Sequence, residues 1–424
     1  MYKAKHYSFD AGGKNKNQAR INCLLLLYFF KIKGLFAMRV LVISHTYIAP
    51  INRKKWQALA SLFSDVDLRI VFPSSWPSTI FNHKAEADLS PYNSDRCTFL
   101  SLDVFKAGNE VLYSYTPIKL FRLIKDFKPD IIHVEQGDNA LSYFQAILFS
   151  KILGINSKFI FFTWVNWRHK FSFKYRLFWT WIEKFNLKKS DAAMVGNADA
   201  QIILREKNFI KSVLVLPQLG VDLQIFRPVK KESRSGIKIG FAGRLVEEKG
   251  VFLLLQAFAE LSNKYNNLKL SYLGSGPCQA QLARQIIDLN LEDKIAIIAP
   301  IPHEQVAVFM QSLDIFVLPS FDMVQWREQF GHVLIEAMAC KVAVLGSDAA
   351  EIPNIIAGVG QIFKQKDYLS LRNALEKLII DESYRNNLAE LGYQKVIKNY
   401  SCAAIAEQTY NFWSSILKKE NCCE

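Results

Sequence analysis

The sequence predicts an α/β protein with two domains, each built on a parallel sheet, and three observations lead to this prediction. Short apolar segments typical of strands alternate with longer segments typical of helices along most of the chain. Segments such as 39–44 and 158–162 are apolar on both faces, as strands are when helices cover both sides of a parallel sheet. A chain of 424 residues is also too long for one ordinary core, so two domains are expected.

The alternation places the expected elements in order along the chain. In the first half it predicts strands at 39–44, 68–72, 130–135, 158–162 and 191–195, and helices at 51–63, 116–127, 139–153, 174–188 and 198–207. The second half repeats the pattern, with helices between strands predicted at 237–241, 268–273, 295–298, 315–318 and 342–345.

A boundary between the two domains is expected where the pattern breaks. The residues that interrupt it are Pro217, Gly220 and Pro228. The chain is therefore expected to divide into a first domain at 38–218, a second at 219–400 and a closing helix at 401–424. Ser401 stands at the start of that helix and is a suitable N-cap, because its hydroxyl can accept a hydrogen bond from an unpaired helix amide.

The first 37 residues differ from the rest and are expected to lie outside the fold. They begin polar and basic and then contain one apolar run of eight residues, CLLLLYFF. Such a run is too short to cross a bilayer, which takes about 20 residues. Two interpretations stay open: translation starts at Met38, which begins an ordinary first strand, or residues 1–37 form a short membrane-associating arm.

Positive charge is concentrated in the first half of the chain. The formal net charge is +14, and residues 1–220 hold 31 of the 53 Lys and Arg but only 16 of the 39 Asp and Glu. Such asymmetry favours a polyanionic partner, either an anionic membrane or nucleic acid. The seven cysteines form no CxxC pair and no regular framework, which is typical of a reduced, cytoplasmic protein.

The most informative segment is 315–355, where two glutamates flank a glycine. A strand-like run, IFVLP, ends before a polar loop that carries Glu328, and Gly331 then precedes an apolar helix that carries Glu336. In open α/β sheets ligands bind beyond the carboxyl ends of the strands. Carboxylates there suit a polyhydroxyl ligand, since each accepts two hydroxyl hydrogens, and a helix N-terminus suits phosphates.

This segment resembles the Glu-x7-Glu signature of retaining glycosyltransferases with the GT-B fold, family 4 of that class. Four more segments agree with the same family in the expected order: VLPQLGVDLQIFRP at 215–228, GFAGRLVEEKGVFLLLQAF at 240–258, LGSGP at 273–277 and IAPIPHEQVAVFMQSLDIFVLPS at 298–320. The resemblance covers 38–415 approximately. It implies two Rossmann-like domains with doubly wound parallel sheets facing a cleft. In that family the first domain binds the acceptor, the second binds a nucleotide-sugar, and the last helix crosses back to the first.

The resemblance also implies roles for individual residues. Arg244 and Lys249 match the contacts to the donor diphosphate, Glu328 the contact to the sugar, and Glu336 the contact to the ribose hydroxyls. Sugar transfer leaves negative charge on the departing diphosphate, so cations beside it stabilise the transition state. Further donor-binding positions are Gly243, Gly274, Phe330 and Gly331. No metal and no cofactor are expected, the nucleotide-sugar being a substrate.

The first domain departs from the common family pattern. Many members carry a glycine pair after the first strand, where this chain has HTYIAPINRKK, and a His where FFTWVN stands here. Val165 and Asn166 occupy that region. Glu135 and His45 stand at predicted strand ends and are expected to face the cleft as catalytic substitutes, whereas His133 lies within an apolar strand and is expected in the core.

The segment 164–189 is both basic and aromatic, with seven Lys and Arg, nine aromatic residues and one acid. Three interpretations stay open. A core helix can point its aromatics inward and its lysines outward. A helix of this composition can also lie in an anionic membrane interface. Stacking on single-stranded nucleic acid is the third, although no reading motif accompanies it and no nucleic-acid partner is expected.

The expected activity is metal-independent hexosyl transfer, with retention of anomeric configuration, from a nucleotide-sugar to a glycan or lipid-linked acceptor in polysaccharide or glycoconjugate biosynthesis. The protein is expected in the cytoplasm, in one interpretation as a peripheral protein on the inner face of the cell membrane. Two alternatives are a nucleotide-sugar epimerase or hydrolase of the same fold and a non-catalytic membrane-binding adaptor. The sequence names neither the sugar, the base nor the acceptor.

Overall fold

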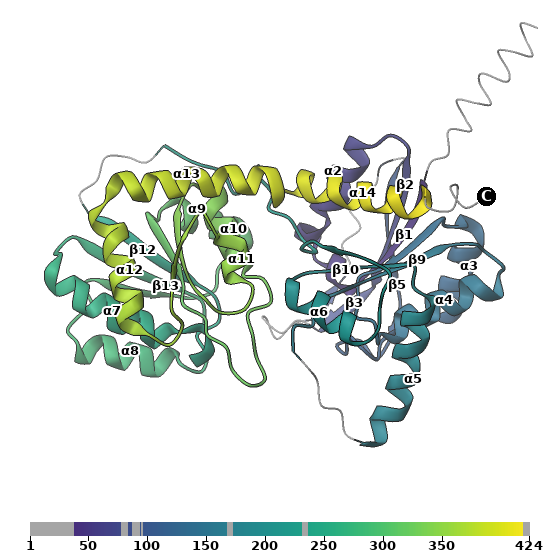
Figure 1. The fold of residues 1–424 in the computed structure, drawn as a ribbon, viewed down its shortest axis with the longest axis horizontal. Coiled ribbons are helices and arrows are strands. Elements are labelled where there is room, and N and C mark those ends of the chain that lie inside the picture. Colours follow the sequence, from purple (N-terminus) through teal and green to yellow (C-terminus); the bar gives the residue numbers. More distant parts are fainter. Residues whose placement is uncertain are drawn as a thin grey trace, which may run out of the picture.

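A computed structural model describes residues 38–77, 84–86, 94, 96–167, 173–230 and 236–418. Two lobes lie side by side, each built on one parallel sheet (Figure 1). The expectations for residues 1–37 and for the chain end after 418 fall outside the described residues.

The first sheet has the strand order β11-β10-β9-β8-β1-β2-β5, and every neighbouring pair is parallel. Its strands are β1 (Met38–Ile43), β2 (Val66–Pro73), β5 (Cys97–Leu102), β8 (Ile131–Val134), β9 (Lys158–Thr163), β10 (Ala192–Val195) and β11 (Ser212–Val215). The helical elements of this lobe are η1 (His45–Ile48), η2 (Pro50–Arg53), α2 (Lys54–Leu62), α3 (Pro117–Phe127), α4 (Leu141–Ile152), α5 (Phe173–Lys189) and α6 (Ala198–Glu206). Two short antiparallel pairs complete it: β3 (Ser75–Pro77) with β4 (Lys84–Glu86), and β6 (Val104–Phe105) with β7 (Ser114–Tyr115).

The second sheet has the order β14-β13-β12-β15-β16-β17 and is also parallel throughout. Its strands are β12 (Ile237–Ala242), β13 (Leu268–Leu273), β14 (Ile295–Ile298), β15 (Ile315–Leu318), β16 (Ala343–Ser347) and β17 (Gln361–Phe363). Its helical elements are η3 (Glu247–Lys249), α7 (Val251–Lys264), α8 (Gln279–Asp288), α9 (His303–Gln311), α10 (His332–Ala339), α11 (Ile352–Ile356), α12 (Tyr368–Ile380) and α13 (Glu382–Asn399).

Each sheet separates two hydrophobic clusters, which explains why its strands are apolar on both faces. In β1, Val40 and Val42 belong to one cluster, and Leu41 and Ile43 belong to another that includes the buried side of α4. In β15 the alternation is the same, with Ile315 and Val317 on one side and Phe316 and Leu318 on the other. The side chains of a strand alternate between faces, so helices must cover both.

The chain crosses between the lobes twice, and the two crossings are hydrogen-bonded to each other. The linker residue Val221 donates to the carbonyl of Tyr400 at 2.8 Å and accepts from the amide of Cys402 at 3.0 Å. Beyond this point α14 (Cys402–Lys418) packs on α2 of the first lobe, where Trp413 stacks on Trp56 with ring centroids 5.6 Å apart. Figure 1 shows α13 over the second lobe and α14 over the first, along the same side of the molecule.

The two-domain α/β prediction is confirmed, and most of the differences lie at the edges of the sheets. Strands β5, β11 and β17 were not predicted, and all three are edge strands. Their burial alternates or is incomplete, so they lack the continuous apolar run of a central strand. The helix predicted from residue 51 begins at Lys54, because η2 precedes it and the buried Arg53 guanidinium donates to the carbonyl of Tyr47.

Candidate functional site

The loop after β15 places Glu328 against a lysine from the loop after β12. Lys249, the last residue of η3, points its Nζ at the Glu328 carboxylate with 2.5 Å between Nζ and Oε2. The Ser320 hydroxyl donates to the same oxygen at 3.0 Å. Both loops follow the carboxyl ends of neighbouring strands, which is why residues 79 positions apart meet. Helix α7 begins directly after Lys249 and Gly250, so its unpaired amides add to the positive potential there.

Helix α10 carries the second carboxylate and begins at a glycine that the fold requires. Gly331 is the N-cap with φ of +84°, a left-handed conformation that favours glycine. Glu336 lies on the second turn, and its carboxylate accepts a hydrogen bond from His303 Nε2 at 3.1 Å. The hydrogen bond from His303 to Glu336 raises the pKa of that imidazole above its usual value. His332 is half-buried, and desolvation lowers its pKa, while the carboxylates of Glu336 and Glu328 oppose that effect.

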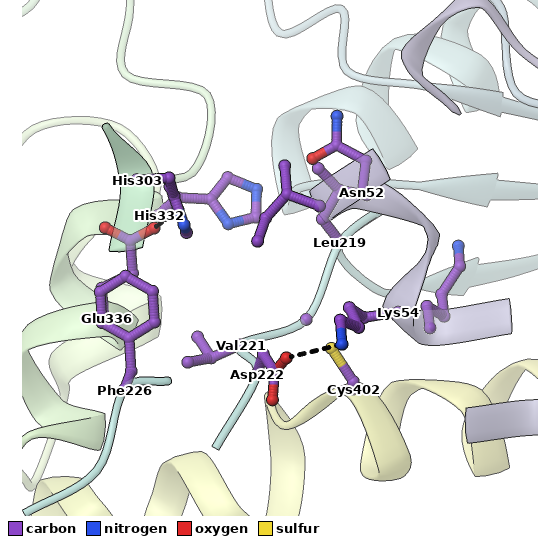
Figure 2. Close-up of a pocket in the computed structure, with 13 residues that line it drawn as sticks. Asn52, Lys54, Leu219, Val221, Asp222, Phe226, His303, His332, Glu336 and Cys402 are labelled. Atoms are coloured by element: carbon purple, nitrogen blue, oxygen red, sulfur yellow. Dashed lines mark hydrogen bonds and ion pairs between the residues drawn. The ribbon is translucent and has the colours of Figure 1, made fainter. Parts of the chain in front are cut away.

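A pocket between the two lobes receives Glu336. Figure 2 shows Glu336, His303 and Phe226 on one side of it and Asn52 and Lys54 of the first lobe on the other. The linker forms the floor, where Asp222 pairs with Lys54 at 3.5 Å. Side chains of both lobes thus line a shared cavity.

The remaining donor-side positions take different places. Gly243 and Gly274 lie in contact at two neighbouring strand ends, since a Cβ on Gly274 would stand 1.9 Å from the Gly243 carbonyl oxygen. The Arg244 side chain is 65% exposed and lies 3.9 Å from the Glu248 carboxylate, so it is not gathered with Lys249 and Glu328 in this structure. Phe330 is a core residue, with its ring 5.9 Å from that of Trp164 of the first lobe.

Glu135 does not face an open cleft, which corrects the expectation from its place at the end of β8. Its carboxylate is fully enclosed and pairs with the buried Lys55 Nζ at 2.8 Å. The Tyr47 hydroxyl also donates to it, and the linker residue Gln218 donates from Nε2 at 3.0 Å. Burial acts to raise the pKa of Glu135, but the charges of Lys55 and His133 and the hydrogen bonds from Lys55 and Tyr47 outweigh it and hold the pKa below its usual value. Glu135 is thus placed to hold the linker.

His45 stands at the carboxyl end of β1, at the edge of the same lobe, with a fifth of its side chain exposed. Its ring stacks on Trp76 at 4.6 Å, and Nδ1 lies 2.6 Å from Gln136 Nε2. Burial lowers the pKa of His45, although the Glu110 carboxylate opposes this. His133 lies in the core, as expected, with both ring nitrogens buried and unpartnered among the described residues.

A row of contacts across the lobes was not predicted. Asn166 Nδ2 donates to the carbonyl of Glu328 at 3.1 Å, and Asn197 Nδ2 donates to that of Gln329 at 3.1 Å. Arg327 Nη1 lies 2.5 Å from the carboxylate of Asp199. The only signal in the sequence was the departure at FFTWVN, which marked Asn166 without indicating a partner.

The basic aromatic helix α5 combines features of a core helix and of a surface. Trp179 and Ile182 are buried, whereas Phe178 and Trp181 are 56% and 55% exposed. Residues 168–172 and the side chains of 173–177 fall outside the described part. Every helix in the described residues is too short or too polar to cross a bilayer. Within the same residues, no three His, Cys, Asp or Glu gather as a metal site requires.

This chain has the GT-B fold. It consists of two Rossmann-like domains with parallel sheets, joined by a linker, and a last helix that returns to the first domain. Solved structures agree with this assignment. Sucrose-phosphate synthase from Thermosynechococcus elongatus superposes with a TM-score of 0.64 at 19% identity, over 90% of this chain and 100% of that chain. Anabaena HepE in complex with UDP superposes with a TM-score of 0.65 at 14% identity, over 89% of this chain and 100% of that chain. At such identities the likeness shows the fold alone.

Comparison of sequences adds a family for the second domain. Residues 224–395 match the model of the family described as "Glycosyl transferases group 1". The capsular polysaccharide biosynthesis glycosyltransferase CapM of Staphylococcus aureus is 29% identical over 184 residues, which are 43% of this chain and 47% of that protein. The chain spans about half the length of the curated relatives it matches. The match falls on the domain that carries Lys249, Glu328 and Glu336.

Proposed function

We propose that this protein is a retaining, metal-independent glycosyltransferase that moves a hexosyl group from a nucleotide-sugar to a glycan or lipid-linked acceptor. The observation that carries the proposal is the Lys249–Glu328 pair at 2.5 Å, next to an α10 that presents Glu336 to the pocket between the lobes. The match of residues 224–395 to group 1 glycosyltransferases supports the reaction class. The UDP complex of a protein with the same fold supports a nucleotide donor.

The chemistry follows from the charges at this site. A donor diphosphate would compete with Glu328 for Lys249, since its negative charge is larger and the α7 N-terminus lies beside it. Glu328, released from the lysine, would accept hydrogen bonds from sugar hydroxyls, and Glu336 would accept them from the ribose. As the glycosyl–phosphate bond breaks, negative charge grows on the departing diphosphate, and Lys249 and the helix amides stabilise it. Arg244 reaches the diphosphate only by turning away from Glu248.

The first test is thermal stabilisation of the protein by a panel of UDP-, GDP- and ADP-sugars with EDTA present. A ligand that binds only the folded state raises the melting temperature. We expect a rise with one nucleotide, lost in Glu336→Ala and kept in Glu390→Ala, a surface glutamate paired with Lys341. A rise that appears only when EDTA is left out would contradict the metal-independent reaction. No rise with any donor would favour a non-catalytic adaptor.

Turnover then separates transfer from the other reactions of this fold. An epimerase or hydrolase consumes the donor without an acceptor, whereas a transferase needs one. With a glycan or lipid-linked acceptor that supports turnover, NMR coupling constants of the product give its anomeric configuration. A product of inverted configuration would contradict retention.

We also propose that α5 docks the first domain on an anionic membrane surface. Phe178 and Trp181 are exposed on a helix whose last turn carries Lys188 and Lys189, the pairing of apolar and basic groups that interfacial helices use. The test is co-sedimentation with anionic and neutral vesicles. The double variant Phe178→Ala/Trp181→Ala should lose binding to anionic vesicles. Ile287→Ala/Val308→Ala, which removes two exposed apolar residues of the second domain, should keep it. Equal recovery of wild type in both supernatants would refute docking.

A further inference from the structure

The first domain holds the donor-site loop by consecutive residues. Arg327 pairs with Asp199, the carbonyl of Glu328 accepts from Asn166, and that of Gln329 accepts from Asn197. The next residue, Phe330, packs its ring against Trp164 of the same lobe. Four residues in a row are thus fixed by the opposite domain.

Glu328 is held from both domains at once. Its carboxylate contacts residues of the second domain, namely Lys249 at 2.5 Å and Ser320 at 3.0 Å. Its backbone carbonyl accepts a hydrogen bond from Asn166 of the first domain at 3.1 Å. Since a side chain moves with its backbone, the contact at the carbonyl also constrains the position of the carboxylate.

The orientation of both amides follows from their partners. Asn166 is 3% exposed, and its Nδ2 must face the Glu328 carbonyl because two oxygens there would repel each other. Its Oδ1 is buried without a partner among the described residues. Asn197 caps α6 by accepting from the Ala200 amide at 2.8 Å, so its Nδ2 is the group that reaches Gln329.

We propose that Asn166 and Asn197 are positioning residues, through which the first domain sets the place of Glu328 in the donor site. The site on the second domain is then complete only when the two domains are closed as they are here. This inference rests on the proposed glycosyl transfer, since it assigns the two amides to the alignment of that reaction.

The main test replaces Asn166 by Asp, which keeps the shape and removes the donor. We expect turnover to fall about tenfold to a hundredfold, because small misplacements of a reacting group have effects of that size. The affinity for the nucleoside diphosphate chosen from the panel (UDP, GDP or ADP) should stay within about twofold, since Lys249 and Glu336 are untouched. Asn166→Ala removes the donor without adding charge and should lose turnover in the same way.

Asn186→Asp is the matched control. Asn186 is also buried, donates from Nδ2 to backbone carbonyls at Asp138 and Ala140, and leaves Oδ1 unpartnered, but all its contacts lie inside the first domain. Its loss should lower the melting temperature and leave the turnover of the folded protein unchanged. Equal loss of turnover in the Asn186 and Asn166 variants, or wild-type turnover in both Asn166 variants, would overturn the inference.

A second measurement does not depend on activity. Hydrogen exchange of peptides that cover 320–332 should quicken in Asn166→Asp and Asn166→Ala relative to wild type and to Asn186→Asp. Unchanged exchange there would overturn the inference even if turnover fell. If wild type turns over no nucleotide-sugar but the exchange responds as expected, the proposed reaction fails and the contact between domains stands.

Discussion

The two domains hold their polar side chains in different ways. In the second domain, Lys249 and Glu328 lie on loops that follow adjacent strands, with part of each side chain exposed to the site. In the first, Lys55 and Glu135 form a pair that is fully buried beneath the linker. A partly exposed pair can exchange a partner for a ligand, whereas a buried pair has no access to one. Under the proposed function, the chemistry falls to the second domain, whereas this part of the first domain supports the interdomain linker.

The sharpest way to break this comparison is to remove one member of the buried pair. Lys55→Met leaves the Glu135 charge buried without its partner, which should reduce the free energy of unfolding by about 3–5 kcal/mol. Chemical denaturation measures the change. Lys264→Met, which removes an exposed partner of Glu376, should change stability little. Recovery is expected in Lys55→Met/Glu135→Leu. A stable Lys55→Met protein that has lost only turnover would show that Glu135 acts in catalysis after all.

The corresponding change in the second domain should act on rate. Lys249→Ala removes the cation that we propose stabilises the departing diphosphate, and turnover should fall by about 10²–10³-fold, as for loss of one donor to a developing anion. Steady-state kinetics with saturating acceptor measures it. Lys264→Ala, at the other end of α7, serves as the control. Wild-type turnover in Lys249→Ala would refute its assigned role.

A pH series tests the buried core of the first domain, where His133 lies. Burial lowers the pKa of His133 to about 4, from an ordinary 6.5. Above pH 6.5 this residue has no effect. Below pH 6.5, His133 binds a proton in the unfolded chain but not in the folded protein, so the free energy of unfolding decreases as the pH is lowered. His133→Leu should remove about 2–3 kcal/mol of the loss between pH 6.5 and 4.5. Parallel stability curves for variant and wild type would contradict this.

The smallest expected effect is at the ion pair that joins the domains. Arg327 and Asp199 are each about one-third exposed, so Arg327→Ala should cost about 1 kcal/mol or less in stability, and less still at high salt. Thermal unfolding at two salt concentrations measures it. A large, salt-independent loss would show that this pair contributes to the fold rather than only to the closed arrangement.

Local pattern was sufficient for the central strands and for the donor-side motifs. A strand covered on both faces is a continuous apolar run, so β1, β9 and β15 could be predicted, whereas the edge strands β5 and β11 could not. The loop carrying Glu328 and the glycine before α10 are also local features. The resemblance of this segment to a known signature, rather than spacing alone, led to the expectation that Glu328 and Glu336 lie near one ligand. It did not indicate that Arg244 would turn toward Glu248.

The sequence by itself therefore determined two parallel-sheet domains and indicated the short motifs of the proposed donor site. Only the tertiary structure decided that Glu135 is enclosed by Lys55 and that Asn166 reaches Glu328 from the other domain. These pairs are 80 and 162 positions apart in the chain. Whether a polar residue at a strand end faces a cleft or a partner depends on what the rest of the chain packs against it, and no local pattern contains that information.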